Sequence, residues 1–491
     1  MTFKLKPDPP EPDKPKPTLP NRPAPGSPSA QKKSEVTDIP KPSPKKKLYW
    51  YRDRLTSLDA FRGFIMLMLA ASGFGIAALA RKEADQPVWN LINYETWQSV
   101  AFQFSHPEWI SSFAPGETSA QAGSPWQHFF VSFWDLIQPS FMFMVGVAMP
   151  FSYARREKTG QSGIARGFHA LLRAAILVLL GVFLQTGSKP ATDWQFPNVL
   201  AQIGLGYFFA YLLLGQKAWI QWSALVVILA GTWAAFFFTP LPNNYDPAAV
   251  NASAEKGEVL AEPFQNWSKN GNVFHQFDVW FLNQFPRPED KPFEFNYGGY
   301  ATLNFVPSIG TMLLGILCGQ LLVAPNGKWK KLGILLLAAG VCWGLGLATG
   351  ATVCPIIKRI WTPSWVLFSG GYVIALLALF YFLFDILPFH KVAYPLVVIG
   401  MNSITAYMMG QLLRPWIINR VIQPHFGWLI EWGLGTLAVQ MNWHESLGVS
   451  AEQAGPAMYE AFQPIVDTTT AFLVMWLILY WMYKNRFFVK I

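Results

Sequence analysis

Long apolar runs dominate the chain after its first fifty or so residues. Each contains about 20 residues, which is enough for a helix to cross a hydrocarbon core of roughly 30 Å. Because lipid offers the backbone no hydrogen-bond partners, each run is predicted to be helical. Ten such runs occur, at about 57–80, 133–153, 168–186, 197–215, 218–239, 301–323, 330–348, 364–387, 391–413 and 464–483. The pattern predicts an all-α, polytopic transmembrane helix bundle of about ten spans.

Composition and charge separate a basic tail from this bundle. Only 14% of the residues are charged, against about 25% in soluble domains. Residues 1–54 hold 13 Lys and Arg but 6 Asp and Glu, whereas the rest of the chain holds 25 and 23. Residues 1–47 are also rich in proline, so we expect a disordered cytoplasmic tail there and a transmembrane domain over 48–491. Because the basic residues lie in a tail rather than on a folded face, no nucleic-acid partner is expected. Lys45–Lys47 offer an alternative contact with anionic lipid.

The placement of lysine and arginine predicts the orientation in the membrane. If the tail is cytoplasmic, most other basic clusters also fall on the cytoplasmic side, as the positive-inside rule requires. The predicted topology then has both termini inside. It is typical of a multi-pass protein of a bacterial inner membrane. The main outward loops are 81–132, 240–300 and 414–463. Lys358 and Arg359 are the main exceptions, because they fall in an outward loop. Within the last loop, residues 416–440 are expected to be interfacial or re-entrant.

Three polar residues inside apolar runs are candidates for a ligand site. Asp59 and Arg62 are three residues apart, so they can pair on one helix face. Charges at membrane depth usually face the bundle interior or a cavity. The pair is either a structural anchor or one wall of an anion site for a phosphorylated cofactor. Asn402 lies in a polar stretch and is either a helix–helix hydrogen-bonding residue or part of a central cavity.

Histidines in the first outward loop are candidates for a general base. His106 and His128 lie there, and Asp135 opens the following apolar run. Histidine is the natural base near neutral pH, although a loop histidine can simply be a surface residue. Asp135 either complements the helix dipole or orients a histidine. No spacing of histidine, cysteine and carboxylate residues predicts a metal site.

Several blocks of sequence, in order, resemble the heparan-α-glucosaminide N-acetyltransferase family of membrane enzymes. They cover roughly residues 54–410. The blocks are RLTSLDAFRG (54–63), DLIQPSFMFMVG (135–146), PNVLAQIGLGY (197–207), GTMLLGILCG (310–319), PIIKRIWTPS (355–364) and GMNSI (400–404).

The resemblance implies an enzyme that takes acetyl-CoA from the cytoplasm and acetylates the amine of a glucosamine-type sugar on the far side. The family's essential histidine precedes a tryptophan by three residues, a pattern that His106 fits and His128 does not. Asp135 would hold the imidazole, and Asp59, Arg62 and Asn402 would bind the cofactor. The 28 residues between His106 and Asp135 must then loop out.

Other functions remain open at this stage. A transporter or lipid-carrier translocator would also place polar residues inside the membrane, and a sugar O-acyltransferase would use the same donor with an alcohol acceptor. A scaffold without catalytic activity is a third alternative. Membrane lipids and an amino-sugar or glycan acceptor are the expected partners. The sequence leaves a homodimer open, and it does not separate direct transfer from an acetyl-histidine route.

Overall fold

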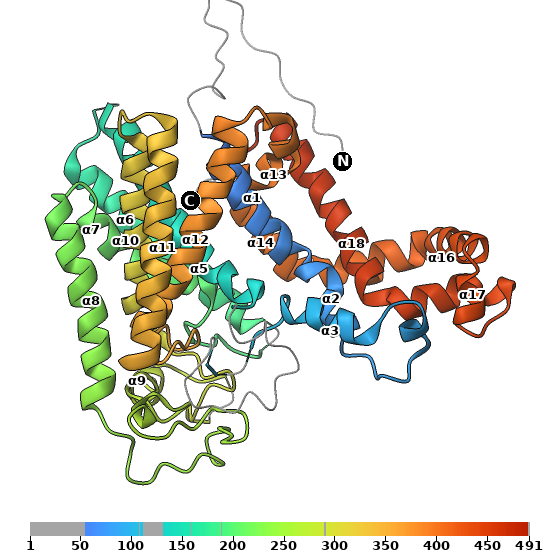
Figure 1. Ribbon diagram of the computed structural model, residues 1–491, viewed down its shortest axis with the longest axis horizontal. Coiled ribbons are helices and arrows are strands. Elements are labelled where there is room, and N and C mark those ends of the chain that lie inside the picture. Colours follow the sequence, from blue (N-terminus) through green and yellow to red (C-terminus); the bar gives the residue numbers. More distant parts are fainter. Residues whose placement is uncertain are drawn as a thin grey trace, which may run out of the picture. The chain divides into compact units, whose positions relative to one another are not determined.

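The protein is helical wherever its structure is described. The computed structural model describes residues 55–107, 109–110, 131–158, 160–187, 189–288 and 291–489, and these ranges contain no strand. The tail over 1–47 and His128 lie outside the described residues. The helices are α1 (Thr56–Ala70), α2 (Ile76–Leu79), α3 (Tyr94–Phe102), α5 (Phe133–Lys158), α6 (Gly163–Thr186), α7 (Val199–Leu213), α8 (Ala218–Phe238), α9 (Val273–Leu282), α10 (Phe305–Val323), α11 (Lys328–Thr352), α12 (Pro363–Tyr381), α13 (His390–Met401), α14 (Ser403–Leu412), α15 (Arg414–Ile417), α16 (Gln423–Gln440), α17 (Trp443–Ser446) and α18 (Ala454–Lys484) (Figure 1).

The prediction of an all-α membrane bundle is confirmed. Seven helices in the described ranges are long and apolar enough to cross a membrane, and two bent helix pairs raise the number to as many as nine. The remaining predicted run, 197–215, corresponds to α7, which is apolar but shorter. The number of spans and the side on which each terminus lies stay predictions.

Glycines let the central helices approach closely. A Cβ atom on Gly146 of α5 would lie 2.1 Å from the Met312 carbonyl oxygen of α10. A Cβ on Gly315 of α10 would lie 2.2 Å from the Phe143 carbonyl oxygen of α5. Without a driving force from water, membrane helices associate through this kind of close van der Waals packing. The contact fixes α5, which carries Asp135, against the core of the bundle.

The first apolar run bends rather than forming one straight helix. Its two helical parts meet at 45°. The bend is a left-handed turn in which Gly73 and Gly75 have φ values of 59° and 71°. Glycine adopts such values at no steric cost. A Cβ on Gly75 would also lie 2.1 Å from the Pro464 carbonyl oxygen of α18, so the turn packs closely on that helix.

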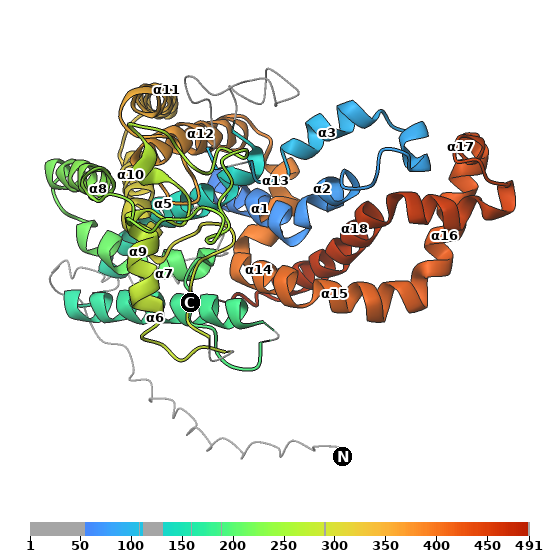
Figure 2. The ribbon, with the colours of Figure 1, turned by 90° about the horizontal axis from the view of Figure 1, so that it is seen from below.

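Three loops that the sequence predicts on the outer side pack together at one end of the helices. Trp109 from the first loop, Trp267 from the α8–α10 loop and Ile357 from the loop before α12 share one buried cluster. The α8–α10 segment, which contains α9, lies at the same end of the helices as α3 (Figures 1 and 2). The three loops therefore form a single folded cap over this end.

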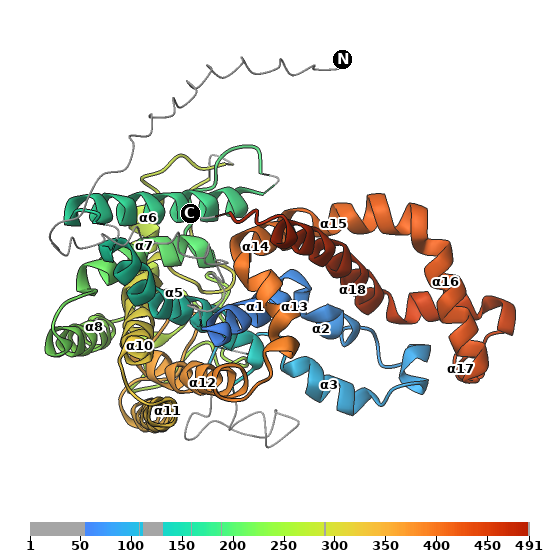
Figure 3. The same cartoon turned by 90° about the horizontal axis from the view of Figure 1, so that it is seen from above.

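Residues 416–440 form helical structure beside α18. The segment continues from α15 into α16, and α14, α15 and α16 all contact α18 (Figure 3). Trp416, Trp428 and Trp432 are exposed. α16 is not among the helices of the described ranges that are long and apolar enough to span. The interfacial or re-entrant placement of 416–440 stays a prediction.

Candidate active site

His106 and Asp135 meet at the end of α5 that carries the loop cap. His106 Nδ1 lies 2.7 Å from Asp135 Oδ1, although 28 residues separate the two in sequence. The His106 side chain is 43% exposed, whereas that of Asp135 is 3% exposed. A buried carboxylate therefore holds one side of an imidazole whose other side is open. Their catalytic role stays a prediction.

Hydrogen bonds tie the chain just before His106 to the start of α5. The Trp134 amide donates to the Gln103 carbonyl at 2.9 Å, and the Phe133 amide donates to the Gln103 side-chain oxygen at 3.0 Å. The Ser132 hydroxyl donates to the Ser105 carbonyl at 2.7 Å. These bonds place His106 next to the first turn of α5.

Lys358 is a third member of this cluster that the sequence prediction missed. Its ammonium donates to Asp135 Oδ1 at 2.8 Å and lies 3.0 Å from His106 Nδ1. The Lys358 side chain is 4% exposed. One signal in the sequence pointed to it, because Lys358 and Arg359 were the main exceptions to the charge asymmetry. We refer to His106, Asp135 and Lys358 as the His–Asp–Lys cluster.

The turn that carries Lys358 is closed by its own hydrogen bonds. The Thr362 hydroxyl accepts from the Ile357 amide at 3.0 Å, and the Thr362 amide donates to the Ile357 carbonyl at 3.1 Å. The Trp361 amide donates to the Lys358 carbonyl at 2.9 Å. A rigid turn presents the ammonium at a fixed place without a regular helix.

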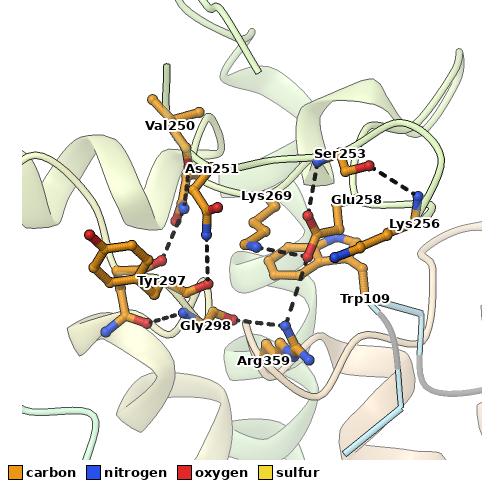
Figure 4. Close-up of polar contacts among 12 residues, drawn as sticks. Trp109, Val250, Asn251, Ser253, Lys256, Glu258, Lys269, Tyr297, Gly298 and Arg359 are labelled. Atoms are coloured by element: carbon orange, nitrogen blue, oxygen red, sulfur yellow. Dashed lines mark hydrogen bonds and ion pairs between the residues drawn. The ribbon is translucent and has the colours of Figure 1, made fainter. Parts of the chain in front are cut away.

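A second charged group holds the backbone around His106. Arg359 donates to the Pro107 carbonyl at 3.1 Å and to the Gly298 carbonyl at 3.3 Å. Its guanidinium is 4.0 Å from Glu258, which also pairs with Lys269 at 2.7 Å. Figure 4 shows Arg359 and Lys269 approaching Glu258 from two sides. This network links the first loop to the α8–α10 loop.

Trp109 anchors the other side of the His106 segment. It is fully buried, and its indole N–H donates to the Trp267 carbonyl at 3.0 Å. Gly299, with φ of 73°, packs on its ring, and a Cβ there would lie 2.4 Å from the Trp109 ring. The tryptophan three residues after His106 is therefore a packing anchor for the loop.

The surroundings favour a neutral imidazole. Burial lowers the pKa of His106 below its usual value, and the Lys358 ammonium acts in the same direction. The hydrogen bond to Asp135 acts against them, but the net direction for the His106 pKa is downward. An unprotonated histidine at neutral pH can accept a proton, as a general base must.

The predicted cofactor residues lie toward the other end of the bundle. Asp59 and Arg62 are 3.8 Å apart on one face of α1, so the predicted pair is present. α1 runs from this pair to Ala70, a distance of roughly 16 Å by helix rise. Gly73 lies just beyond that end, and its Cβ position contacts Phe104 and Trp134, which neighbour His106 and Asp135 in the chain. The Asn402 side chain donates to the Phe487 carbonyl and accepts from the Val489 amide, both at 3.1 Å. Asn402 thus holds the C-terminal segment, and its role toward a cofactor stays a prediction.

A pocket between α5, α6 and α7 offers another basic surface. It lies at the C-terminal end of α5, the end opposite to Asp135. Its lining residues are Met149, Ser152, Tyr153, Arg166, His169, Ala170, Tyr207, Tyr211 and Leu214. Arg166 stacks over the Tyr153 ring at 4.5 Å, and the neighbouring Arg173 over the Tyr207 ring at 4.9 Å. In the described part of the chain, the buried Nε atoms of both arginines have no hydrogen-bond partner. Phosphate oxygens would satisfy such donors.

Comparison with known families agrees with this organisation. Over the residues that the structure describes, the helical architecture and the several helices long and apolar enough to cross a membrane are typical of an integral membrane protein. Residues 117–251 match the family model described as heparan-alpha-glucosaminide N-acetyltransferase, catalytic. This segment is therefore similar to the catalytic part of that transferase family, and the similarity covers 135 of the 491 residues. The matched segment includes Asp135 and the α5–α6–α7 pocket residues but neither His106 nor Lys358. A search among curated proteins finds no match.

Proposed function

We propose that this protein transfers an acetyl group from cytoplasmic acetyl-CoA to the amine of a glucosamine-type sugar on the other face of the membrane. The observation that carries the proposal is the 2.7 Å contact between His106 and the buried Asp135. The family match supports transfer of an acyl or acetyl group. Direct transfer and transient attachment to His106 are two routes to the same product.

In the direct route, His106 Nε2 takes a proton from the acceptor amine as the amine nitrogen attacks the thioester carbonyl carbon. The carbon–sulfur bond then breaks, and the departing CoA thiolate takes the proton from His106. In the other route, Nε2 itself attacks the carbonyl carbon, the carbon–sulfur bond breaks and CoA leaves as the thiolate. The amine nitrogen then attacks the acetyl carbon on His106, the bond from that carbon to Nε2 breaks, and the proton lost by the amine passes to the CoA thiolate. Both routes need a free Nε2 lone pair, because a protonated imidazole can neither accept a proton nor act as a nucleophile.

The donor must reach from one end of the bundle to the other. The phosphates of acetyl-CoA and its thioester lie at opposite ends of the molecule. Asp135 and Tyr153 both lie on α5, and their separation along the helix is roughly 25 Å by helix rise. We therefore propose that cationic groups at the far end bind the phosphates while the thioester reaches His106. Arg62 of α1 and the α5–α6–α7 pocket are the two candidate places.

The experiment is a labelled-acetyl assay with the purified protein and a panel of sugars. We expect label from acetyl-CoA in glucosamine-type acceptors and none in sugars without an amine. Label on hydroxyl groups would instead favour a sugar O-acyltransferase. If acetyl-CoA neither binds nor turns over, the proposal is wrong and a transporter becomes the better account.

A further inference from the structure

Lys358 is a buried cation placed where it touches both partners of the candidate base. Lysine is almost never fully buried unless it is paired. Here the side chain is 4% exposed, and its ammonium contacts Asp135 Oδ1 and His106 Nδ1 at 2.8 and 3.0 Å. Its turn is also closed by hydrogen bonds within 357–362. The position of the Lys358 ammonium is thus fixed both by its turn and by its two polar neighbours, which suggests a role in controlling their charge.

The two polar neighbours of His106 Nδ1 restrict where the ring can carry its proton. Nδ1 has either one hydrogen or one lone pair in the ring plane, so it cannot serve both neighbours. If Nδ1–H donates to Asp135 Oδ1, the same oxygen also accepts from Lys358, and the 3.0 Å approach of the ammonium to Nδ1 is then a contact between two donors and not a hydrogen bond. The opposite tautomer is worse, because it would set the Nδ1 lone pair against a carboxylate oxygen at 2.7 Å. The tautomer with Nδ1–H leaves the lone pair on Nε2. A proton on Nε2 would create a cation beside the fixed Lys358 ammonium, which is unfavourable.

We infer that Lys358 is a positioning residue that keeps His106 neutral, with Nδ1–H directed at Asp135 and the Nε2 lone pair free. The inference rests on the proposed function for its catalytic meaning, but the protonation state itself does not. Without Lys358, the buried Asp135 carboxylate would have His106 as its main partner and would favour the imidazolium. Lys358 thus offsets the Asp135 charge while leaving its orienting hydrogen bond in place.

The other charged groups around His106 support the same direction. Arg359, from the same loop as Lys358, binds the Pro107 carbonyl and adds positive potential. Tyr300, from the α8–α10 loop, places its ring 6.0 Å from the Lys358 ammonium. Within the described ranges, Asp135 of α5 is the acidic group in direct contact with the imidazole. The net lowering of the His106 pKa agrees with this balance.

The test measures the protonation of His106 without relying on activity. Diethyl pyrocarbonate modifies unprotonated imidazole, and the exposed face of His106 admits it. The rate at the peptide containing His106 is followed by mass spectrometry from pH 5 to 9 in the purified full chain. In Lys358→Met we expect the midpoint of this profile to rise by about one to three pH units. An unchanged midpoint in the folded variant overturns the inference.

Lys269→Met is the matched control. It also removes a buried ammonium paired with a carboxylate, Glu258, in the same loop cap. Lys269 is not among the groups that act on the pKa of His106, so the midpoint should stay at the wild-type value. A shift as large as that of Lys358→Met would show a general effect of losing a buried cation and would overturn the specific role.

Lys358→Met leaves the buried Asp135 carboxylate without the ammonium that offsets its charge, which can prevent folding. A second pair of variants keeps the test valid in that case. Asp135→Asn is compared with Asp135→Asn/Lys358→Met. Removal of Lys358 should raise the midpoint in this background too, and equal midpoints overturn the inference. Acetyl transfer is measured separately on the wild type. A normal midpoint shift without any transfer contradicts the proposed function and leaves the inference about Lys358 standing.

Discussion

At the scale of residues, His106 combines an open face with buried charged neighbours. Its side chain is 43% exposed, while those of Asp135 and Lys358 are 3% and 4% exposed. The exposed face can meet an acceptor, and the buried face fixes the ring. Electrostatic interactions are stronger where water is excluded, so the two neighbours control the proton of His106 more than surface charges would.

We predict that His106→Ala removes nearly all transfer while expression and acetyl-CoA binding persist. Loss of a general base typically costs a factor of about 10²–10⁴ in rate. His128→Ala should stay within a few-fold of the wild type, because His128 lacks the tryptophan three residues downstream that the family pattern requires. Initial rates of label transfer from acetyl-CoA measure both. Retained activity in His106→Ala with a dead His128→Ala would reverse the assignment.

The pair of Asp59 and Arg62 should behave as one unit. Removing either partner leaves a charge at membrane depth, whereas replacing both with apolar residues leaves none. We expect Asp59→Leu and Arg62→Leu each to lower the thermal midpoint in detergent more than the double variant does. Additive losses in this double-mutant cycle would show that the 3.8 Å contact contributes nothing to stability.

At the scale of elements, the site depends on how closely α5 packs on α10. Gly146 and Gly315 lie on facing sides of this contact, and either Cβ would come within 2.2 Å of a backbone oxygen of the other helix. Backbone cannot move aside as a flexible side chain can. The helix that carries Asp135 is therefore fixed by residues well away from the site.

Gly315→Ala should push the two helices apart. Overpacking of this kind costs roughly 1–3 kcal/mol in the free energy of unfolding, and we expect a clear fall in the thermal midpoint in detergent. Gly344→Ala is the control, because a Cβ there meets nothing within 4 Å. It should be neutral or slightly stabilising, since alanine is the better helix former. Equal midpoints for the two variants would contradict the close packing.

The sequence predicts the elements better than it predicts their contacts. Apolar periodicity is local, so the helices appear where the runs were found, and His106 and Asp135 could be paired through the family pattern. The bend at Ser72–Gly75 was missed because the hydropathy of the run continues through it. Lys358 was missed because it meets Asp135 across 223 residues of sequence. Contacts of that kind depend on the fold, and no spacing in the sequence encodes them.

At the scale of the whole molecule, the loop cap joins three segments that are far apart in the chain. Trp109, Trp267 and Ile357 share one core, and the His–Asp–Lys cluster lies among the same loops. The positive-inside rule predicts that these loops lie outside. If they do, the candidate site of transfer and the proposed cytoplasmic source of the donor lie on opposite sides of the membrane.

Single cysteines should report this sidedness. In a variant without native cysteines, we expect Ser119→Cys and Ser253→Cys to react with an impermeant maleimide from outside in intact cells. Ser43→Cys should react only after the membrane is opened. Labelling of residues 43 and 119 from the same side of the membrane would contradict the predicted topology.

The most direct test of the account is acetyl transfer across a sealed membrane. Purified protein is reconstituted into vesicles with a glucosamine-type acceptor trapped inside, and labelled acetyl-CoA is added outside. Molecules whose tail faces outward should build up labelled N-acetylated sugar inside the vesicles, and vesicles with His106→Ala should not. Product that forms only when donor and acceptor share one side, or equally well without His106, would contradict the account.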